Sequence, residues 1–282
     1  MGVVRCGMGR LRLSGIGNVK VKLHRKMEGT LKTVGVTCDG DGHWYALVTR
    51  EVPRKVLPGT GHQVGLDVGL RAFVATSDGE WVPNPRPLES ARLEVERAQR
   101  KVSRRSRGSK RRAKAKRLLA RAHARVRNAR KDFQHKTART LVVRNDRLAV
   151  EDLNLKGLAR GRLARPIHDA AWGQFVSILA AKAEEAGREL LRVDPRGTSQ
   201  RCSACDQQVP KDLSVRVHQC PHCGLVLDRD VNAARNILRA PAVAEPETRP
   251  GRGLRGAAPA RRRGQPRRTA DSKDPRSSLL AR

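Results

Sequence analysis

The feature that most constrains the fold of this chain is a pair of Cys-x-x-Cys knuckles in its final third. Two residues separate Cys202 from Cys205 and Cys220 from Cys223, and fourteen residues lie between the two pairs. A knuckle of this spacing points two thiolates at one centre, and two knuckles complete a tetrahedral zinc shell. The spacing therefore predicts a zinc ribbon. Its role is structural, because four thiolates leave no open coordination position for a substrate.

Other interpretations of these residues stay open at this point. The two motifs could be a chance pair or a redox dithiol, and His218 and His222 lie close enough in the sequence to compete as zinc ligands. Gly224, directly behind the second knuckle, favours the tight turn that a zinc ribbon needs. Cys6 and Cys38 have no partner pattern, so we interpret them as incidental free thiols.

The charge of the chain indicates a polyanionic partner. Sixty Lys and Arg residues stand against 27 Asp and Glu, which gives a formal net charge of +33. This excess does not suit an enzyme of neutral substrates and favours nucleic acid. Aromatic residues make up only 2% of the chain, so phosphate contacts rather than base stacking should carry the affinity. No apolar run is long enough to cross a membrane and no signal peptide is visible, so we expect a cytoplasmic protein without a membrane partner.

The periodicity of the sequence predicts an α/β fold with several inserted parts. Period-two segments on either side of the turn Asp39-Gly40-Asp41-Gly42 predict a small, basic β module. We expect this module to be partial and the chain to be truncated at its N-terminus. The predicted parts are the β module in 1–60, a core in 61–198, the zinc ribbon in 199–226, a last helix in 227–239 and a disordered basic tail in 240–282.

Within the core, residues 88–140 predict a helical hairpin of unusual charge. Apolar residues recur there at spacings of three and four, with an interruption around Gly108. Between Arg97 and Lys131 there are seventeen Lys or Arg residues and no acid. Such a run is often only a solvated face, but without acids it repels itself unless a polyanion neutralises it. The candidate phosphate contacts are Arg104, Arg105, Lys110, Arg111, Arg112, Lys114, Lys116 and Arg117.

Three acids on separate elements predict a second kind of metal site. Asp67 lies in the middle of an apolar strand, Glu151 ends another strand beside Asp152, and Asp230 opens the helix after the knuckles. Any one of them could be a loop acid, or a helix cap in the case of Asp228 or Asp230. Two strand-borne carboxylates and one helix-borne carboxylate can together bind two divalent ions about 4 Å apart, as in phosphodiester cleavage.

These residues also carry a resemblance to a known family. The segments Gly65–Leu70 and Val150–Asn154, the two knuckles, and Asp228–Ile237 resemble, in this order, the motifs of the TnpB (OrfB) proteins encoded by insertion sequences. Those proteins are relatives of the type V CRISPR effectors. The resemblance covers about residues 15–239, and its last motif is the most specific.

The resemblance implies a fold, an activity and partners. The fold would be a ribonuclease-H-like (RuvC) mixed sheet with a basic helical-hairpin insertion and an inserted zinc ribbon, preceded by a small partial β-barrel module. The activity would be RNA-guided, Mg²⁺-dependent DNA cleavage, with a guide RNA from the transposon end and a target DNA as partners. By motif position, Asp67, Glu151 and Asp230 would be the catalytic acids, with Asp228 in reserve.

Two alternatives to this activity stay open. The first is a non-cleaving nucleic-acid-binding remnant or repressor of the same family. The second is a transposase that transfers strands itself, for which the sequence offers no tyrosine nucleophile site: Tyr45 is the only tyrosine, and no His-x-His pair accompanies it. Proteins of this family are nevertheless often labelled transposases.

Overall fold

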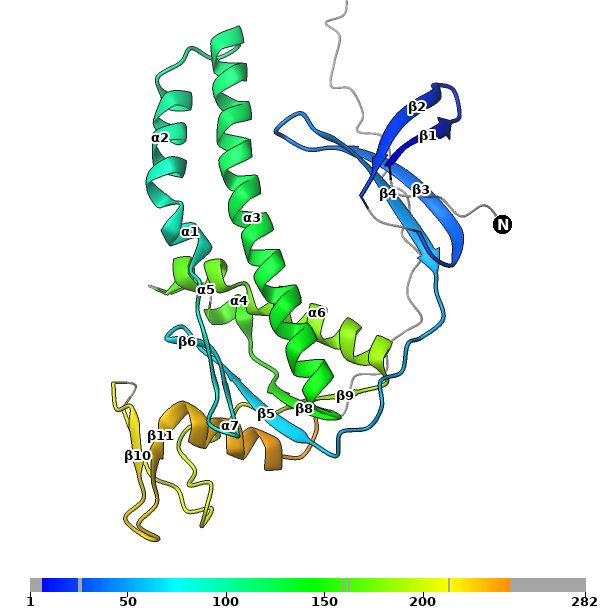
Figure 1. Cartoon of the computed structure of the whole chain (residues 1–282). Coiled ribbons are helices and arrows are strands. Elements are labelled where there is room, and N and C mark those ends of the chain that lie inside the picture. Colours follow the sequence, from blue (N-terminus) through cyan, green and yellow to red (C-terminus); the bar gives the residue numbers. More distant parts are fainter. Residues whose placement is uncertain (1–6, 25–26, 159, 162, 213, 244–282) are drawn as a thin grey trace, which may run out of the picture. The chain divides into compact units, whose positions relative to one another are not determined.

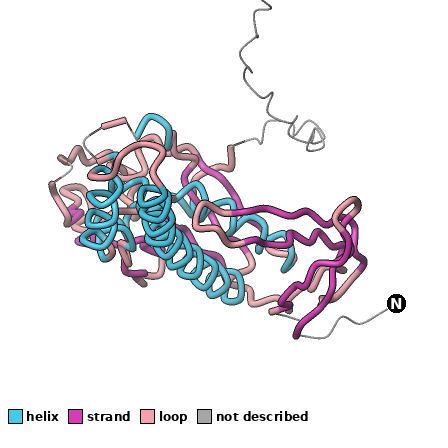
Figure 2. The backbone as a smooth tube through the Cα atoms, turned by 90° about the horizontal axis from the view of Figure 1, so that it is seen from above, coloured by secondary structure: helices cyan, strands magenta, loops and turns pink. Residues whose placement is uncertain are grey.

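The computed structural model of the chain describes residues 7–24, 27–158, 160–161, 163–212 and 214–243 (Figure 1). The strands are β1 Gly7–Leu13, β2 Gly17–Leu23, β3 Thr30–Cys38, β4 Trp44–Glu51, β5 Gln63–Val68, β6 Ala72–Thr76, β7 Trp81–Pro83, β8 Arg147–Glu151, β9 Glu189–Val193, β10 Val217–Gln219 and β11 Val226–Asp228. The helices are α1 Pro87–Ser90, α2 Arg92–Ser103, α3 Lys110–Arg144, α4 Leu155–Leu158, α5 Ala164–Ala170, α6 Trp172–Ala186 and α7 Arg229–Arg239. Figure 2 shows the same division of the backbone into helices, strands and loops.

A five-stranded mixed sheet forms the centre of the fold, which confirms the predicted mixed α/β sheet. Its strand order is β7-β6-β5-β8-β9. The pairs β7–β6 and β6–β5 are antiparallel, whereas β5–β8 and β8–β9 are parallel. In the β5–β8 pair, Leu66 lies opposite Val150. The carboxyl ends of these two central strands therefore meet at one edge of the sheet.

Helices α3 and α6 cover one face of the sheet. Leu66 and Val150 are fully buried on this face, in one cluster with Ala138 of α3 and Phe175 of α6. Phe73 of β6 contacts both Phe175 and Phe133 edge to face, with ring centroids 4.9 Å apart in each pair. These apolar strands are buried on both faces, which explains why they read as almost continuous hydrophobic runs.

Helix α7 covers the opposite face. Because side chains alternate along a strand, Gly65 and Ala149 face away from the α3–α6 core. Ala149 is buried with Val193 of β9 and Ile237 of α7. Asp67 and Glu151 lie two residues further along their strands and so share the face that α7 covers.

The predicted helical hairpin is present and longer than expected. Helices α2 and α3 lie side by side (Figure 1), and Arg125 of α3 forms an ion pair with Glu94 of α2. Ala98 and Val102 of α2 are buried, as are several apolar residues of α3. The Oγ of Ser109 accepts a hydrogen bond from the backbone N–H of Arg112 and so caps α3 at its start.

The N-terminal β structure consists of two separate two-stranded antiparallel sheets in the described residues, β1–β2 and β3–β4. The β3–β4 hairpin follows the predicted turn, in which the backbone N–H of Asp39 donates to the carbonyl of His43. Strand β1 lies within the β module predicted for residues 1–60, although no separate strand was assigned there.

The first four residues of the predicted disordered tail are ordered. Residues 240–243 are ordered against β9: Ala242 forms an antiparallel bridge with Val193, and the N–H of Val243 donates to the carbonyl of Arg192 at 2.8 Å. This correction has a simple cause, since β9 is the edge strand of the sheet and offers unpaired backbone groups. Cys6 and the rest of the predicted tail, 244–282, lie outside the described residues. Among the described helices, none has the length and apolar character of a membrane-spanning segment.

Candidate active site and metal centre

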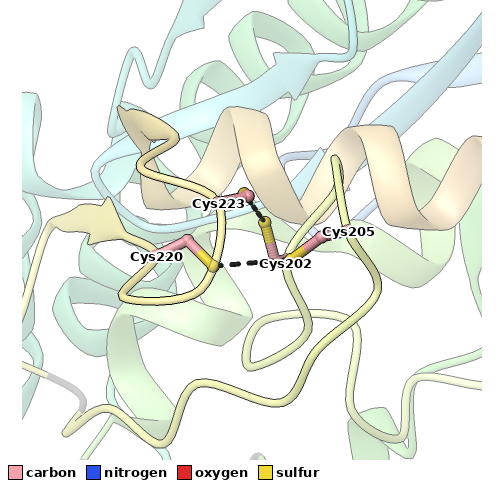
Figure 3. Close-up of side chains that lie close together, drawn as sticks. All are labelled: Cys202, Cys205, Cys220 and Cys223. Atoms are coloured by element: carbon pink, nitrogen blue, oxygen red, sulfur yellow. Dashed lines mark hydrogen bonds between the residues drawn. The ribbon is translucent and has the colours of Figure 1, made fainter.

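The four knuckle cysteines converge on one point (Figure 3). Their sulfur atoms all lie within 4.8 Å of one another, with 3.6 Å between Cys202 and Cys223 and 3.5 Å between Cys205 and Cys220. A zinc ion bound tetrahedrally at about 2.3 Å requires sulfur–sulfur separations of roughly 3.8 Å. The thiol cluster fits a zinc ion, and neither His218 nor His222 belongs to it.

The same backbone hydrogen bond closes each of the two knuckles. In each knuckle the N–H four residues after the first cysteine donates to that cysteine's carbonyl, from Asp206 to Cys202 and from Gly224 to Cys220. Both donor residues have positive φ, 62° at Asp206 and 73° at Gly224, which glycine adopts without strain. Burial raises the pKa of the Cys220 thiol, but the backbone N–H groups that point at its sulfur outweigh this effect and lower the pKa to about 6. The backbone N–H of Gln207 lowers the pKa of Cys205, but burial and the other three thiols outweigh it and raise this pKa to about 12. In the metal-free cluster the charge is therefore held unequally by the four sulfur atoms. A thiolate is the form that binds a metal.

The three predicted acids lie on three elements, β5, β8 and α7, that adjoin the α7 face of the sheet. Continuing the β5–β8 register by one residue from Leu66 and Val150 places Asp67 beside Glu151 at the ends of the two strands. Asp230 lies in the first turn of α7. Burial, together with the negative charges of Glu151 and Asp230, raises the pKa of Asp67 well above its usual range. Glu151 and Asp230 therefore both act on Asp67 electrostatically. The three carboxylates are less tightly gathered than the cysteines, which form the only group of three or more metal-ligating side chains within 4.8 Å of one another in the described residues.

The other two acids have raised pKa values for related reasons. Burial raises the pKa of Glu151, although a hydrogen bond from the hydroxyl of Thr198 opposes the change. Burial and the charge of Asp228 raise the pKa of Asp230. Partly buried carboxylates that repel one another are costly in a metal-free protein and become favourable when cations bind between them.

Asp228 has a different role from Asp230. Its side chain is the N-cap of α7 and accepts hydrogen bonds from the backbone N–H groups of Asp230 and Val231, at 2.8 and 3.4 Å. The capping role, which the sequence left open for either acid, belongs to Asp228. Asp152, next to Glu151, is exposed and lies 3.5 Å from Arg192.

The α7 sequence places this helix against both the sheet and the ribbon. Gly65 and Ala234 lie at the contact with β5, where a β-carbon on Gly65 would clash with the helix backbone. Asn232 and Asn236, four residues apart, donate side-chain hydrogen bonds to the carbonyl of Arg201 just before the first knuckle. One helix thus carries Asp230 and joins the acid cluster to the zinc ribbon.

Several residues around the site were not found from the sequence. The guanidinium of Arg71 lies 5.0 Å above the ring of Trp81 and 3.5 Å from the carboxylate of Asp228. Thr198 is buried and donates to Glu151. The only sequence signal for Arg71 is its position directly behind the β5 motif, and Thr198 has none, because its contact spans 47 residues.

The candidate phosphate contacts occupy one end of the helical hairpin. Arg104 and Arg105 lie in the turn between α2 and α3, and the other six lie in the first turns of α3. Arg112 already has a partner within the protein, since its guanidinium donates a hydrogen bond to the carbonyl of Arg105. A shallow hollow on α3 is lined by Lys110, Ala113, Lys114, Arg117, Leu118 and Arg121. The structure therefore groups three of the predicted residues on one face and adds Arg121 to them.

Two family models match this chain. Residues 46–162 match a family of IS605 OrfB proteins described as "Probable transposase", and residues 172–237 match the TNB domain of Cas12f1-like proteins. The first match includes β5 and β8 with their acids, and the second includes all four knuckle cysteines and α7 as far as Ile237.

Two related proteins agree with these matches. A protein of Streptomyces pristinaespiralis named "Putative RNA-guided DNA endonuclease" is 39% identical over 74% of this chain and 52% of its own length. A protein of the same description from Escherichia coli, InsQ, is 30% identical over 82% of this chain and 62% of its own length. A cryo-EM structure of a CRISPR-Cas12f ternary complex aligns with a TM-score of 0.49 and 19% identity over 71% of this chain and 43% of that one.

The chain thus spans 52% and 62% of the lengths of these two relatives. Within the two matched segments, 46–162 and 172–237, lie the two acid-bearing strands, the helical hairpin between them, the zinc-binding knuckles and most of α7. The chain belongs to the TnpB/OrfB family of IS605-type proteins and carries a Cas12f1-like TNB zinc-binding domain.

Proposed function

We propose that this chain is an RNA-guided, Mg²⁺-dependent DNA endonuclease in which Asp67, Glu151 and Asp230 bind the divalent ions. The observation that carries the proposal is that Asp67 and Glu151 stand at the ends of two adjacent parallel strands, and that the charges of Glu151 and of Asp230, in the first turn of α7, both act on Asp67. The relatives named for this activity support the same conclusion. In finer terms, we assign residues 61–198 to a ribonuclease-H-like (RuvC) core, 88–140 to its hairpin insertion, 199–226 to the ribbon, 227–239 to the final helix and 1–60 to a partial β-barrel module.

The residues present fit a divalent cation. The three acids offer carboxylate oxygens, which Mg²⁺ prefers as ligands. Burial of all three, and the negative charges of Glu151 and Asp230 near Asp67, would be offset by a bound cation. When bound, such ions lower the pKa of an attacking water and neutralise charge at the leaving oxygen.

Other residues of the chain position the acids and supply positive charge. Asp228 caps α7 and so fixes the turn that carries Asp230. Gly65 lets α7 lie directly against β5, which brings Asp230 to the strand ends. Arg71, beside Asp228, adds positive charge near the cluster. The basic face of α3 is suited to hold backbone phosphates, while pairing with a guide RNA would supply sequence specificity.

The test is a cleavage assay on the purified complex. The chain is co-expressed with the RNA that flanks its element, and matched DNA is added with Mg²⁺. We expect cutting by the wild type, loss of cutting in Asp67→Ala with RNA binding retained, and near-normal cutting in Asp152→Ala, which removes an exposed acid next to Glu151. RNA binding without cutting by the wild type would contradict the proposal and favour a non-cleaving binding protein or repressor of the same family.

A further inference from the structure

The hydroxyl of Thr198 is directed at one of the three acids. Thr198 follows β9 and is buried, with 6% of its surface exposed. Its Oγ1 lies within hydrogen-bonding distance of Glu151 Oε1 and 3.1 Å from the carbonyl oxygen of Pro195. A hydroxyl has a single proton to donate, and an ionised carboxylate is a stronger acceptor than a carbonyl. The proton of Thr198 is therefore donated to Glu151.

The backbone of Thr198 is held in turn by the helix that carries Asp230. The side-chain amide of Asn236 donates to the carbonyl of Thr198 at 2.8 Å and to that of Arg201 at 2.7 Å. Asn232, one turn earlier on the same face of α7, donates to Arg201 and accepts a hydrogen bond from the N–H of Ser203 at 2.9 Å. Both asparagines are buried.

These contacts link the two metal centres by a short path. Ser203 lies inside the first zinc knuckle, next to Cys202, and only three residues separate Thr198 from Cys202. The N–H of Arg201 donates to the carbonyl of Gly197 at 2.9 Å, which closes this segment into a turn. The segment from Thr198 to Ser203 is thus fixed at one end by the acid cluster, at the other by the zinc ribbon and in between by α7.

We propose that Thr198 is a positioning residue for the divalent-metal site, and that Asn232 and Asn236 make its position depend on the folded zinc ribbon. The inference rests on the proposed function of the three acids. A glutamate side chain has three rotatable bonds, so an unsupported Glu151 would point its carboxylate in several directions. The Thr198 hydroxyl selects one of them. Such supporting hydrogen bonds are worth about 10- to 100-fold in metal affinity where they have been removed.

The experiment measures Mn²⁺ binding by the full zinc-loaded chain, using the electron paramagnetic resonance signal of free Mn²⁺. Thr198→Val removes the hydroxyl and keeps the shape of the side chain, and we expect it to bind Mn²⁺ about 10-fold more weakly. Thr198→Ser restores the hydroxyl and should bind within about twofold of the wild type. In a Glu151→Ala background, Thr198→Val should change the affinity by less than about twofold, because the hydroxyl no longer has a carboxylate to hold.

Zinc content and the melting temperature, both measured without Mn²⁺, show whether a substitution acts only by destabilising the fold or the ribbon. If Thr198→Val loses zinc or melts early, Thr198→Ala takes its place, since it adds no apolar methyl group beside the carboxylate. Mn²⁺ binding that needs Asp67 but is unchanged by both substitutions would overturn this inference alone. A wild type whose Mn²⁺ binding does not depend on Asp67 would overturn the proposed metal site, and this inference with it.

Discussion

Gly65 and Ala234 approach so closely that no side chain fits between β5 and α7. A β-carbon built on Gly65 would lie 1.9 Å from the carbonyl oxygen of Ala234 and 2.9 Å from the backbone nitrogen of Leu238. These are backbone atoms of a helix and cannot rotate away. The contact lies two residues before Asp67 on β5 and four residues after Asp230 on α7, so it sets how close these two acids come.

Substituting this glycine should therefore separate the acids as well as weaken the fold. For Gly65→Ala we expect a loss of at least about 1–3 kcal/mol in the free energy of unfolding, because the helix must shift to relieve the overlap. Mn²⁺ binding should weaken with it. Urea denaturation and Mn²⁺ titration measure the two effects.

The matched control is Gly161→Ala. A β-carbon on Gly161 would meet nothing within 4 Å, and its backbone does not adopt a positive φ. We expect a change of no more than about 0.5 kcal/mol there. Equal losses in the two variants would mean that the close contact at Gly65 has no special importance.

The parts of the site that the sequence predicts are those with a local signal. Asp67 stands out as an acid in an apolar strand, and the two knuckles stand out by their spacing. The role of Asp230 is less clear from the sequence, because either Asp228 or Asp230 could cap α7. Only the hydrogen bonds from the N–H groups of α7 show that Asp228 is the cap.

The missed residues are ordinary types whose partners are distant in the chain. Thr198 donates to a residue 47 positions away, and Asn236 to one 38 positions away. No periodicity or motif encodes such pairs. The short helices α4 and α5 were missed for another reason: they have four and seven residues, too few to show a helical repeat. Tertiary contacts, such as the burial of Ile167 in the core, stabilise them instead.

The raised pKa of Asp67 predicts an unusual dependence of stability on pH. A carboxyl group whose pKa is higher in the folded state binds its proton more tightly there. Its contribution to stability is fully present below the unfolded pKa of about 3.9 and is lost as the pH rises through the folded pKa. Because burial and the charges of Glu151 and Asp230 raise this pKa, the Mg²⁺-free protein should lose stability above pH 4.

Asp67→Asn removes this ionisation. We expect the zinc-loaded variant without Mg²⁺ to melt at a higher temperature than the wild type at pH 7.5, and the difference to shrink towards pH 4. Added Mg²⁺ should raise the melting temperature of the wild type more than that of the variant. Asp152→Asn, at an exposed acid, is the control. A variant that melts below the wild type at neutral pH would contradict the prediction.

Zinc removal should affect both metal centres. We expect about one zinc ion per chain by elemental analysis, and its loss when Cys202 and Cys205 are both replaced by serine. Because Asn232 holds Ser203 and Asn236 holds Thr198, loss of the ribbon should also weaken Mn²⁺ binding by the acids. Replacing the exposed Cys38 by serine should change neither property. An unchanged zinc content in the double variant would refute the ribbon site.

The basic face of α3 predicts a specific change in salt dependence. Lys114, Arg117 and Arg121 line one hollow and lie on one side of the helix, at spacings of three and four residues. Each phosphate contact adds about 0.9 to the slope of log affinity against log salt on duplex DNA. Replacing all three residues by alanine should reduce the slope by roughly 2–3 for an RNA–DNA duplex probe, with weaker binding at low salt.

A triple variant with the same change in net charge provides the control. Arg125, Lys136 and Arg144 are exposed residues of α3 that form ion pairs with Glu94, Asp132 and Glu80. Acids already neutralise these three cations, so their replacement by alanine should reduce the slope much less. Fluorescence anisotropy at several KCl concentrations compares the two variants. Equal slopes would mean that the net charge of the chain, rather than this face of α3, determines binding.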